Sequence, residues 1–275
     1  MENDAPAQGI IRPLRGKGEP RLGPDALMVM VPGELRHLVR KSGAEEVKSR
    51  HFPLFRMYRT GRGPGQAVTL AGPFIGAPHA VMGLEKLIVL GVKRILVLGW
   101  CGSLQPHLKI GALVIPESAL SEEGTSQHYP LTRGKPVSDP DLNRAIETSL
   151  KGRGLGFTRG RLWTTDAIYR ETPEKVVGYR KRGVLAVEME FSALLTVAAF
   201  RSVSLAGLLV VSDELFELRW RPGFSDPLLR ENTRLAGEIL LGLSQDLTSL
   251  DPPGTRGAES GRDGGTGRRY GPSCQ

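Results

Sequence analysis

The sequence has few cysteines, few aromatic residues and no long apolar run. Its two cysteines, Cys101 and Cys274, lie in an apolar segment and in a polar tail, so no structural disulfide is expected between them. No apolar run reaches the ~18 residues of a membrane-spanning helix, and the N-terminal stretch MENDAPAQGIIRPLRGKGEP lacks the apolar core of a secretory signal. We therefore expect a protein of the reducing cytoplasm without a membrane partner.

Positive charge exceeds negative charge without forming a cluster. The 275 residues include 37 Lys and Arg against 29 Asp and Glu, a formal net charge of +8. These positive residues are scattered, with no run that resembles a basic arm or stripe for nucleic acid. A solvated basic surface explains the excess most simply, and a site for small anions is the alternative. We expect no nucleic-acid partner.

Composition divides the chain into a folded part and two polar ends. Residues 1–24 are rich in glycine, proline and charge, and we interpret them as a flexible leader. Residues 251–275 have almost no aliphatic side chains and cannot bury enough apolar surface to offset the entropy lost on ordering, so we predict a disordered tail. The predicted folded domain spans residues 25–250 and contains no internal repeat.

Apolar strand-like runs alternate with helical patterns within this domain. Strands are predicted to begin at Ala26, Gln66, Arg94, Ala112, Phe157, Val184 and Leu205. Helices are predicted over Pro78–Leu90, Asp141–Leu150, Phe191–Phe200 and Leu228–Leu247. Several strand runs are nearly all apolar, which is typical of strands covered on both faces. The alternation predicts a single α/β domain around a mostly parallel or mixed central sheet.

The segment VVSDE, residues 210–214, brings an acidic group out of an apolar strand. A strand that ends here places Asp213 at the rim of the sheet, where a half-buried carboxyl group can act as a general acid. The simpler interpretation is a helix N-cap, because serine and aspartate both cap helices well. The motif alone leaves both open.

The segment AVEMEFSALL, residues 186–195, places two glutamates between a predicted strand and a predicted apolar helix. Charged residues rarely lie between two buried segments without a role. A carboxylate at Glu190 or Glu188 can accept hydrogen bonds from adjacent sugar hydroxyls, and Met189 can pack on the apolar face of a sugar. The alternative is a carboxylate in a first helical turn, favoured by the helix dipole.

Two glycine-containing segments also follow predicted strands. Residues Gly99–Ser103, GWCGS, are expected to form a turn whose backbone N–H groups can approach a ligand closely. In VPGELR, a turn at Gly33 leads into a helix with Arg36 in its first turn, an arrangement that can bind phosphate. An ordinary strand–turn–helix with a surface arginine is the alternative. A dinucleotide-binding module is not favoured, because GWCGS lacks the GxGxxG spacing.

Taken in order, PGELR, GWCGSLQPH, VEME and VSD resemble the nucleoside phosphorylase superfamily: purine nucleoside phosphorylases, uridine phosphorylases and related nucleosidases. The resemblance covers about residues 26–245 and depends most on VEME followed by SD. The stretch GSLQPHLKIGALVI looks like uridine phosphorylase, whereas LAVEMEFSALL and VSDE look like the purine enzymes. The resemblance implies a barrel-like central sheet flanked by helices and a homo-oligomer, dimer or hexamer, with sites shared between subunits.

The resemblance further implies a mechanism in which a nucleophile attacks C1′ of the sugar while the base leaves. In the transition state the sugar has oxocarbenium character, and charge develops on the base. Asp213 would protonate or hydrogen-bond the leaving base, with Ser212 beside it. Glu190 would hold the ribose 2′ and 3′ hydroxyls, Met189 would pack against the sugar, and Glu188 would line the same pocket.

The remaining matched residues belong to the base and phosphate ends of such a site. Ile168 falls where the family usually has an aromatic wall for the base. Gly33 and Arg36 would lie at the phosphate end, and Arg50 resembles an arginine that a neighbouring subunit contributes there. The glycine-rich segment adds Gly99 and Trp100 as substrate-binding candidates. No metal and no cofactor are implied, with inorganic phosphate as the co-substrate.

The sequence departs from the family pattern at the phosphate end. Val97 stands where the phosphorylases have an arginine, and Trp100 where they have serine or threonine. PGELR is one residue shorter than the usual motif, and YRETPEK replaces the uracil-reading GQER motif. Trp100 either stacks on a ligand or fills core space.

Three interpretations therefore compete. The first is phosphorolysis of a purine or pyrimidine nucleoside, giving free base and (deoxy)ribose 1-phosphate. The second is hydrolysis by a phosphate-independent nucleosidase, which the changes at Val97 and Trp100 favour and Arg36 opposes. The third is a non-catalytic nucleoside-binding protein, which the presence of Glu190 and Asp213 opposes.

Overall fold

Strands from the whole described part of the chain join in one mixed sheet, and the middle of that sheet closes on itself. The computed structural model describes residues 9–48, 54–61, 67–131 and 135–247. The strands are β1 (Asp25–Val29), β2 (Glu45–Glu46), β3 (Arg56–Arg59), β4 (Thr69–Gly72), β5 (Arg94–Ser103), β6 (Leu113–Glu122), β7 (Thr158–Thr165), β8 (Ala186–Glu188), β9 (Ser204–Glu214) and β10 (Arg221–Pro222). Their order across the sheet is β10-β9-β6-β7-β8-β5-β1-β4-β3-β2.

Strands β5, β9, β6, β7 and β8 form a closed barrel. β5 runs parallel to β9 from the pair Arg94–Ser204 to the pair Ser103–Glu214, and its end also pairs with β8 in antiparallel direction. β7 lies parallel to both β6 and β8, and β6 pairs antiparallel with β9 to complete the ring. This arrangement confirms the predicted single α/β domain with a mixed, barrel-like central sheet. It also brings the ends of β5, β8 and β9 together.

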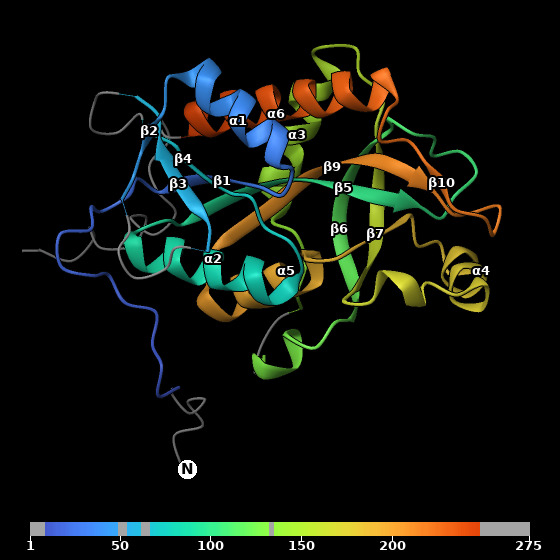
Figure 1. Cartoon of the computed structure of the whole chain (residues 1–275), viewed down its shortest axis with the longest axis horizontal. Coiled ribbons are helices and arrows are strands. Elements are labelled where there is room, and N and C mark those ends of the chain that lie inside the picture. Colours follow the sequence, from blue (N-terminus) through green and yellow to red (C-terminus); the bar gives the residue numbers. More distant parts are fainter. Residues whose placement is uncertain (1–8, 49–53, 62–66, 132–134, 248–275) are drawn as a thin grey trace, which may run out of the picture.

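Helices cover both faces of the sheet (Figure 1). α1 (Pro32–Ser42), α3 (Pro140–Lys151) and α6 (Pro227–Leu247) lie on one face, whereas α2 (Ala77–Leu90) and α5 (Phe191–Arg201) lie on the other. The buried apolar residues divide in the same way: Leu84 and Leu194 belong to one cluster, and Leu38 and Leu240 to another. Each such fully buried leucine stabilises the fold by about 1.5–3 kcal/mol. The helices thereby hold the barrel rigidly between them.

The glycine-rich segment does not form the predicted turn, because Gly99–Ser103 continue strand β5. A β-carbon on Gly99 would lie 3.0 Å from Leu209 Cδ2, and one on Gly102 would lie 2.8 Å from Leu215 Cδ1. The glycines therefore allow β9 and the residues after it to pack closely on β5 instead of reversing the chain. A β-bulge at the same place shifts the register between the two strands.

Most other elements lie where the sequence predicts them. The strand predicted from Gln66 is β4, although Gln66 itself lies outside the described residues. The helix α4 (Pro173–Lys181) was not predicted, although proline at its first position is a recognised start signal. The Thr172 hydroxyl accepts a hydrogen bond from the Lys175 N–H at 3.5 Å and caps this helix. The unpredicted β2, β3 and β10 are too short for a periodic pattern to reveal.

The two predicted polar ends can be compared with the structure only in part. Residues 9–24 contain no helix or strand, but Glu19 and Leu22 are buried, and Glu19 Oε2 lies 2.6 Å from Lys86 Nζ. The end of the predicted leader therefore packs on the domain through a buried ion pair that composition does not reveal. The predicted tail, residues 251–275, lies outside the described residues.

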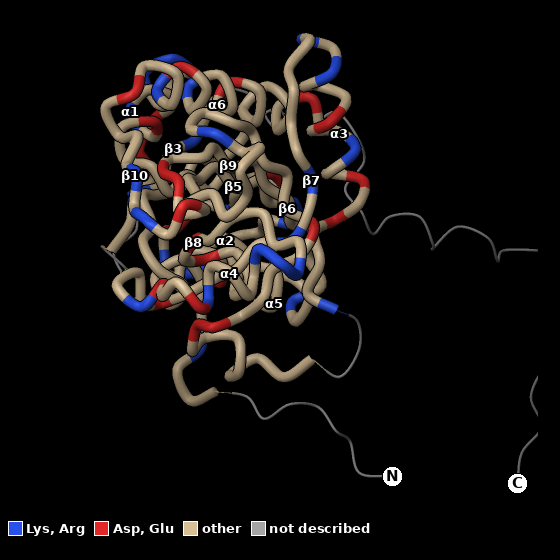
Figure 2. Tube along the Cα trace, turned by 90° about the vertical axis from the view of Figure 1, so that its right-hand side faces the viewer, with Lys and Arg blue, Asp and Glu red and all other residues tan. Residues whose placement is uncertain are grey.

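Positive and negative residues are mixed along the chain of the domain. Lys and Arg residues are interspersed with Asp and Glu along the described trace (Figure 2). This pattern is typical of a solvated surface and differs from the basic stripe of nucleic-acid-binding proteins. In the ranges that the structure describes, none of the helices combines the length and the apolar character needed to cross a membrane.

Candidate active site

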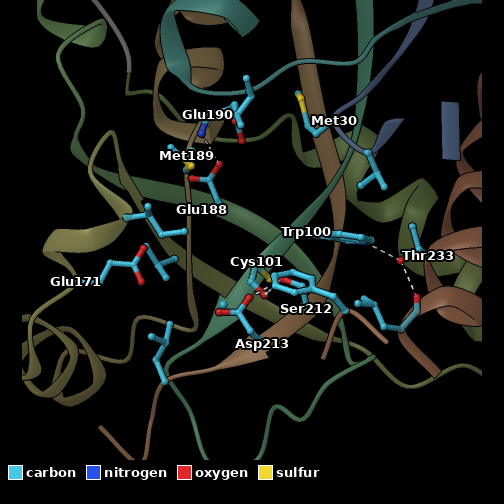
Figure 3. A pocket seen from close by; sticks show the side chains of 18 of the residues that line it. Met30, Trp100, Cys101, Glu171, Glu188, Met189, Glu190, Ser212, Asp213 and Thr233 are labelled. Carbon is cyan, nitrogen blue, oxygen red and sulfur yellow. Dashed lines mark hydrogen bonds between the residues drawn. The ribbon is translucent and has the colours of Figure 1, made fainter. Parts of the chain in front are cut away.

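A large cavity of about 1210 Å³ opens where β5, β8 and β9 end. Its walls also come from the start of α1, the segment before α2, the short 3₁₀ helix η2 (Ile168–Arg170) and the first turns of α6. Eight residues that the sequence singled out line it: Gly33, Trp100, Ile168, Glu188, Met189, Glu190, Ser212 and Asp213. In Figure 3, Glu188, Met189 and Glu190 lie on one side of the cavity, Trp100 lies on another, and Ser212 and Asp213 lie below them.

Two predicted residues are not part of this lining, and a third lies outside the described residues. Arg36 is exposed on α1 and does not line the cavity, which agrees with the alternative of a surface arginine. Gly99 is buried in β5 against Leu209 and Met30. Arg50 lies outside the described residues.

Asp213 lies near the end of β9, half-buried, with its carboxylate held by two donors. The Ser212 hydroxyl donates to Oδ1 at 2.6 Å, and the Trp220 indole N–H donates to Oδ2 at 3.0 Å. Gly102 on β5 makes room for this carboxylate, since a β-carbon there would lie 3.0 Å from Oδ2. Asp213 is thus a fixed strand-end carboxyl group beside a ligand-sized cavity, and it does not cap a helix.

Glu188 ends strand β8, lines the cavity and accepts hydrogen bonds where α5 begins. Its Oε2 accepts hydrogen bonds from the backbone N–H groups of Glu190 at 2.7 Å and Phe191 at 2.6 Å, where α5 begins. Its Oε1 accepts a short hydrogen bond from the Thr164 hydroxyl. Burial, with the neighbouring Glu190, raises the pKa of Glu188 above its ordinary value. The alternative of a carboxylate favoured by the helix N-terminus therefore describes Glu188 well.

Glu190 reaches toward the segment before α2. Its Oε1 accepts a hydrogen bond of 2.6 Å from the backbone N–H of Gly76, a residue with φ of 76°. Burial raises the pKa of Glu190, and backbone hydrogen bonds from Gly76 and Met189 oppose that rise. Gly76 adopts this left-handed conformation without steric cost and aims its N–H at the carboxylate. Glu190 and Asp213 thereby reach one cavity from two different strand ends.

Aromatic rings occupy the side of the cavity next to α6. The Trp100 indole N–H donates to Thr233 Oγ1 at 2.8 Å, so its single donor is used within the protein. Its ring centroid lies 5.9 Å from that of Phe224, which in turn lies 6.1 Å from that of Trp220. Val97 is 1% exposed in the apolar core and is not a lining residue. This wall is apolar where the family pattern has phosphate-binding side chains.

Charged groups that the sequence did not single out surround this aromatic wall. Arg230 and Arg234 are exposed on one side of α6 and line the cavity, four residues apart and hence on one helix face. Glu34, next to Gly33, is buried with its Oε1 lacking a hydrogen-bond partner, and burial raises its pKa. The sequence does indicate that the two arginines share a face, because they are spaced i, i+4 in the predicted helix Leu228–Leu247.

Glu171 is another cavity residue that the sequence reasoning missed. It follows η2, lines the cavity and lies toward Asp213 (Figure 3). Burial, together with the charge of Asp213, raises the pKa of Glu171 to about 7. The sequence signal that could have indicated Glu171 is its place in YRETPEK, the segment that stands where uridine phosphorylases have their uracil-reading motif.

The phosphorylase superfamily model matches residues 24–239 of this chain. A DeoD-type purine nucleoside phosphorylase of Bacillus cytotoxicus is 30% identical over 202 residues, covering 72% of this chain and 86% of the relative. One from Caldanaerobacter subterraneus subsp. tengcongensis is 34% identical over 163 residues, covering 57% of this chain and 68% of the relative.

Solved structures show the same fold at lower identity. Purine nucleoside phosphorylase of Toxoplasma gondii in complex with immucillin-H has a TM-score of 0.74 at 22% identity, covering 83% of this chain and 93% of that one. Uridine phosphorylase of Vibrio fischeri ES114 has a TM-score of 0.72 at 22% identity, covering 82% and 93%. The model match and the Bacillus relative confirm the predicted family: the chain belongs to the phosphorylase superfamily, alongside purine nucleoside and uridine phosphorylases.

Proposed function

We propose that this protein is a nucleoside phosphorylase that cleaves the N-glycosidic bond of a purine or pyrimidine nucleoside with inorganic phosphate. The products are the free base and (deoxy)ribose 1-phosphate. The observation that carries the proposal is that Glu190 and Asp213 line one cavity from two strand ends. A sugar-binding carboxylate and an acid for the leaving base must meet in this way around one glycosidic bond.

The proposed chemistry divides the cavity between the base and the sugar. The bond from C1′ to the base nitrogen breaks, its electron pair goes to the base, and Asp213 donates a proton or a hydrogen bond to that base. Ser212 holds Oδ1 of Asp213 and so fixes the carboxyl group. Glu190 binds the sugar hydroxyls, and its charge lies near the positive charge that develops on the sugar. Acid assistance of this kind supplies about 10²–10⁴ in rate.

Phosphate is proposed as the nucleophile, forming the new bond from its oxygen to C1′. In support, Arg230 and Arg234 of α6 line the cavity, as does Gly33 in the first turn of α1. The two relatives from Bacillus and Caldanaerobacter, to which this chain is similar, are both named as purine nucleoside phosphorylases. The proposal involves no metal or other cofactor.

Hydrolysis is the second candidate, and two observations favour it. The Trp100 ring occupies the wall next to α6, and its N–H is bound to Thr233. Glu34 also lies at this end, where an ionised carboxylate would repel a phosphate dianion. With phosphate excluded, water would attack C1′ and the product would be free ribose.

A screen of purine and pyrimidine nucleosides with and without phosphate tests both candidates. The protein is first dialysed free of phosphate, released base is measured, and the sugar product is identified by phosphorus NMR. We expect base release that requires phosphate and yields the sugar 1-phosphate. Equal release without phosphate would establish hydrolysis instead. Nucleoside binding without any turnover would leave only a non-catalytic binding protein.

We further propose that the protein works in the cytoplasm as a homo-oligomer, a dimer or hexamer. The mouth of the cavity carries exposed apolar side chains, including Leu54, Ile75 and Tyr169, which a neighbouring subunit could cover. Cys101 is a free, buried thiol, which suits a reducing compartment. Light scattering in solution tests the assembly, and a monomeric mass would contradict it.

A further inference from the structure

Glu171 holds a carboxyl group at a fixed place in the cavity wall. Its backbone N–H donates to the Ile168 carbonyl at 3.4 Å, which ties it to η2. The next residue, Thr172, caps α4. The carboxyl group therefore projects from a short turn held between two helical segments and not from a free loop.

The carboxyl groups of Asp213 and Glu190 have hydrogen-bond donors, whereas none of the described residues donates to the side chain of Glu171. Asp213 accepts from Ser212 and Trp220, and Glu190 accepts from Gly76. Among the described residues, the Glu171 side chain forms no hydrogen bond or ion pair. A half-buried carboxyl group without a donor is costly in free energy, so a ligand that supplies N–H donors would bind favourably.

The neighbours of Glu171 define what kind of group it would meet. Ile168, Val176 and Leu215 line the same cavity with apolar surface, and Asp213 faces Glu171 from β9. A flat ring that reaches Asp213 would present its far edge toward Glu171. An ionised Glu171 carboxylate accepts hydrogen bonds, so the edge of the ring that faces it should carry donors, whereas the edge at Asp213 accepts the proton or hydrogen bond that Asp213 donates.

We propose that Glu171 reads the base, selecting nucleosides whose base carries an exocyclic amino group over those with a carbonyl oxygen in its place. This inference rests on the proposed function, since it assigns the cavity to a nucleoside. An amino group offers N–H donors to the Glu171 carboxylate. A carbonyl oxygen in the same place would bring its lone pairs against the Glu171 carboxylate, so two acceptors would face each other without a donor. A site that leaves polar groups unpaired in this way discriminates strongly against that base.

Two matched pairs of substrates test the proposal. Adenosine and inosine, and cytidine and uridine, each differ by an amino group in place of a carbonyl oxygen, and the carbonyl member also has a hydrogen on the adjacent ring nitrogen. A Glu171 carboxylate that met this ring N–H instead of the exocyclic group would prefer the carbonyl member, which is the opposite result. The values of kcat/KM are compared at about pH 8, above the raised pKa of Glu171 of about 7, where its ionised form predominates. We expect the wild-type protein to prefer the amino member of the pair by about tenfold or more, as for a hydrogen bond to a charged group.

Glu171→Gln should remove most of this preference, because an amide can present either a donor or an acceptor to the base. Glu174→Gln is the control, since Glu174 is exposed on α4 only three residues away. Glu171→Asp, which keeps the charge, should keep the direction of the preference at lower kcat/KM. A wild-type preference for the carbonyl member, or an unchanged preference in a folded Glu171→Gln protein, would overturn the proposal.

A binding measurement separates this inference from the proposed function. Calorimetry with free adenine and free hypoxanthine needs no turnover. If no nucleoside is cleaved, the proposed function fails, yet tighter binding of adenine that is lost in Glu171→Gln would still support base reading by Glu171. Equal binding of the two bases would overturn the inference even if turnover is observed.

Discussion

The two ends of the cavity differ in how their residues are held. At the end proposed to bind base and sugar, Asp213, Glu188 and Glu190 follow directly from strands or begin a helix, and each accepts hydrogen bonds from nearby donors. At the end next to α6, Trp100 and Phe224 form an apolar wall, and Arg230 and Arg234 stay exposed. The first end is fixed by the barrel itself. The second depends on side chains from elements far apart in the chain, so substitution can change its chemistry without disturbing the fold.

Asp213→Asn attacks the first end and should have the largest effect. An amide cannot donate a proton as an acid, so turnover should fall at least about tenfold and by as much as about 10⁴-fold. The amide oxygen can still accept from the Trp220 indole N–H, and the amide NH2 group can donate to the Ser212 hydroxyl, so the melting temperature should change little. Steady-state kinetics and thermal denaturation are the measurements. Asp141→Asn, exposed on α3, is the matched control, and equal activity in both variants would remove the acid role.

Glu190→Gln tests the sugar half of the same end. Loss of the charge should weaken the hydrogen bonds to the ribose hydroxyls, so kcat/KM for a riboside should fall about tenfold more than for its 2′-deoxyriboside. The measurement is the ratio of the two values in wild type and variant. Glu231→Gln, exposed on α6, should leave that ratio unchanged. A ratio that Glu190→Gln also leaves unchanged would contradict the assignment to the 2′-hydroxyl.

The sequence could predict that polar residues at strand ends lie together in one cavity. It could not predict which side chains reach that cavity from the connections between elements. VEME and VSD each follow an apolar strand, and because strand ends meet at the rim of a closed sheet, their neighbourhood follows from the fold. Trp220, Phe224 and Glu171 lie in connections between elements, where no periodic pattern records which way a side chain points. The predicted turn at Gly99–Ser103 is wrong because glycine favours turns but also permits close packing of strands. Only the position of Leu209, which lies against Gly99, distinguishes a turn from a packed strand.

Trp100→Ser sharpens the contrast between the two ends by restoring a small hydroxyl at the second one. If the ring occupies the anion position, its removal should lower the KM for phosphate several-fold, because phosphate gains both space and a donor. Thr233→Val is the companion variant, since it removes the partner of the indole N–H and keeps the ring. Phosphate titrations at saturating nucleoside measure the effect. An unchanged KM for phosphate in Trp100→Ser would place this side chain away from the anion.

Glu188→Gln should have the smallest effect, on stability and not on chemistry. The ordinary pKa of this group is near 4.5, and burial with the nearby Glu190 raises it in the folded protein. Between those two values the unfolded chain has lost a proton that the folded chain retains, so stability falls as pH rises through this window and levels off above it. Burial also raises the pKa of Glu190, which contributes to the pH dependence in the same direction.

The glutamine variant cannot titrate at position 188, yet its amide oxygen can still accept a hydrogen bond from the Phe191 N–H. Between about pH 5 and about pH 8, the melting temperature of the variant should therefore fall less than that of wild type, by a few degrees. Glu174→Gln, exposed on α4 with a lowered pKa, should keep the wild-type slope. A slope in Glu188→Gln as steep as in wild type would mean that Glu188 is already ionised in the folded protein at pH 6, held by the N–H groups at the start of α5.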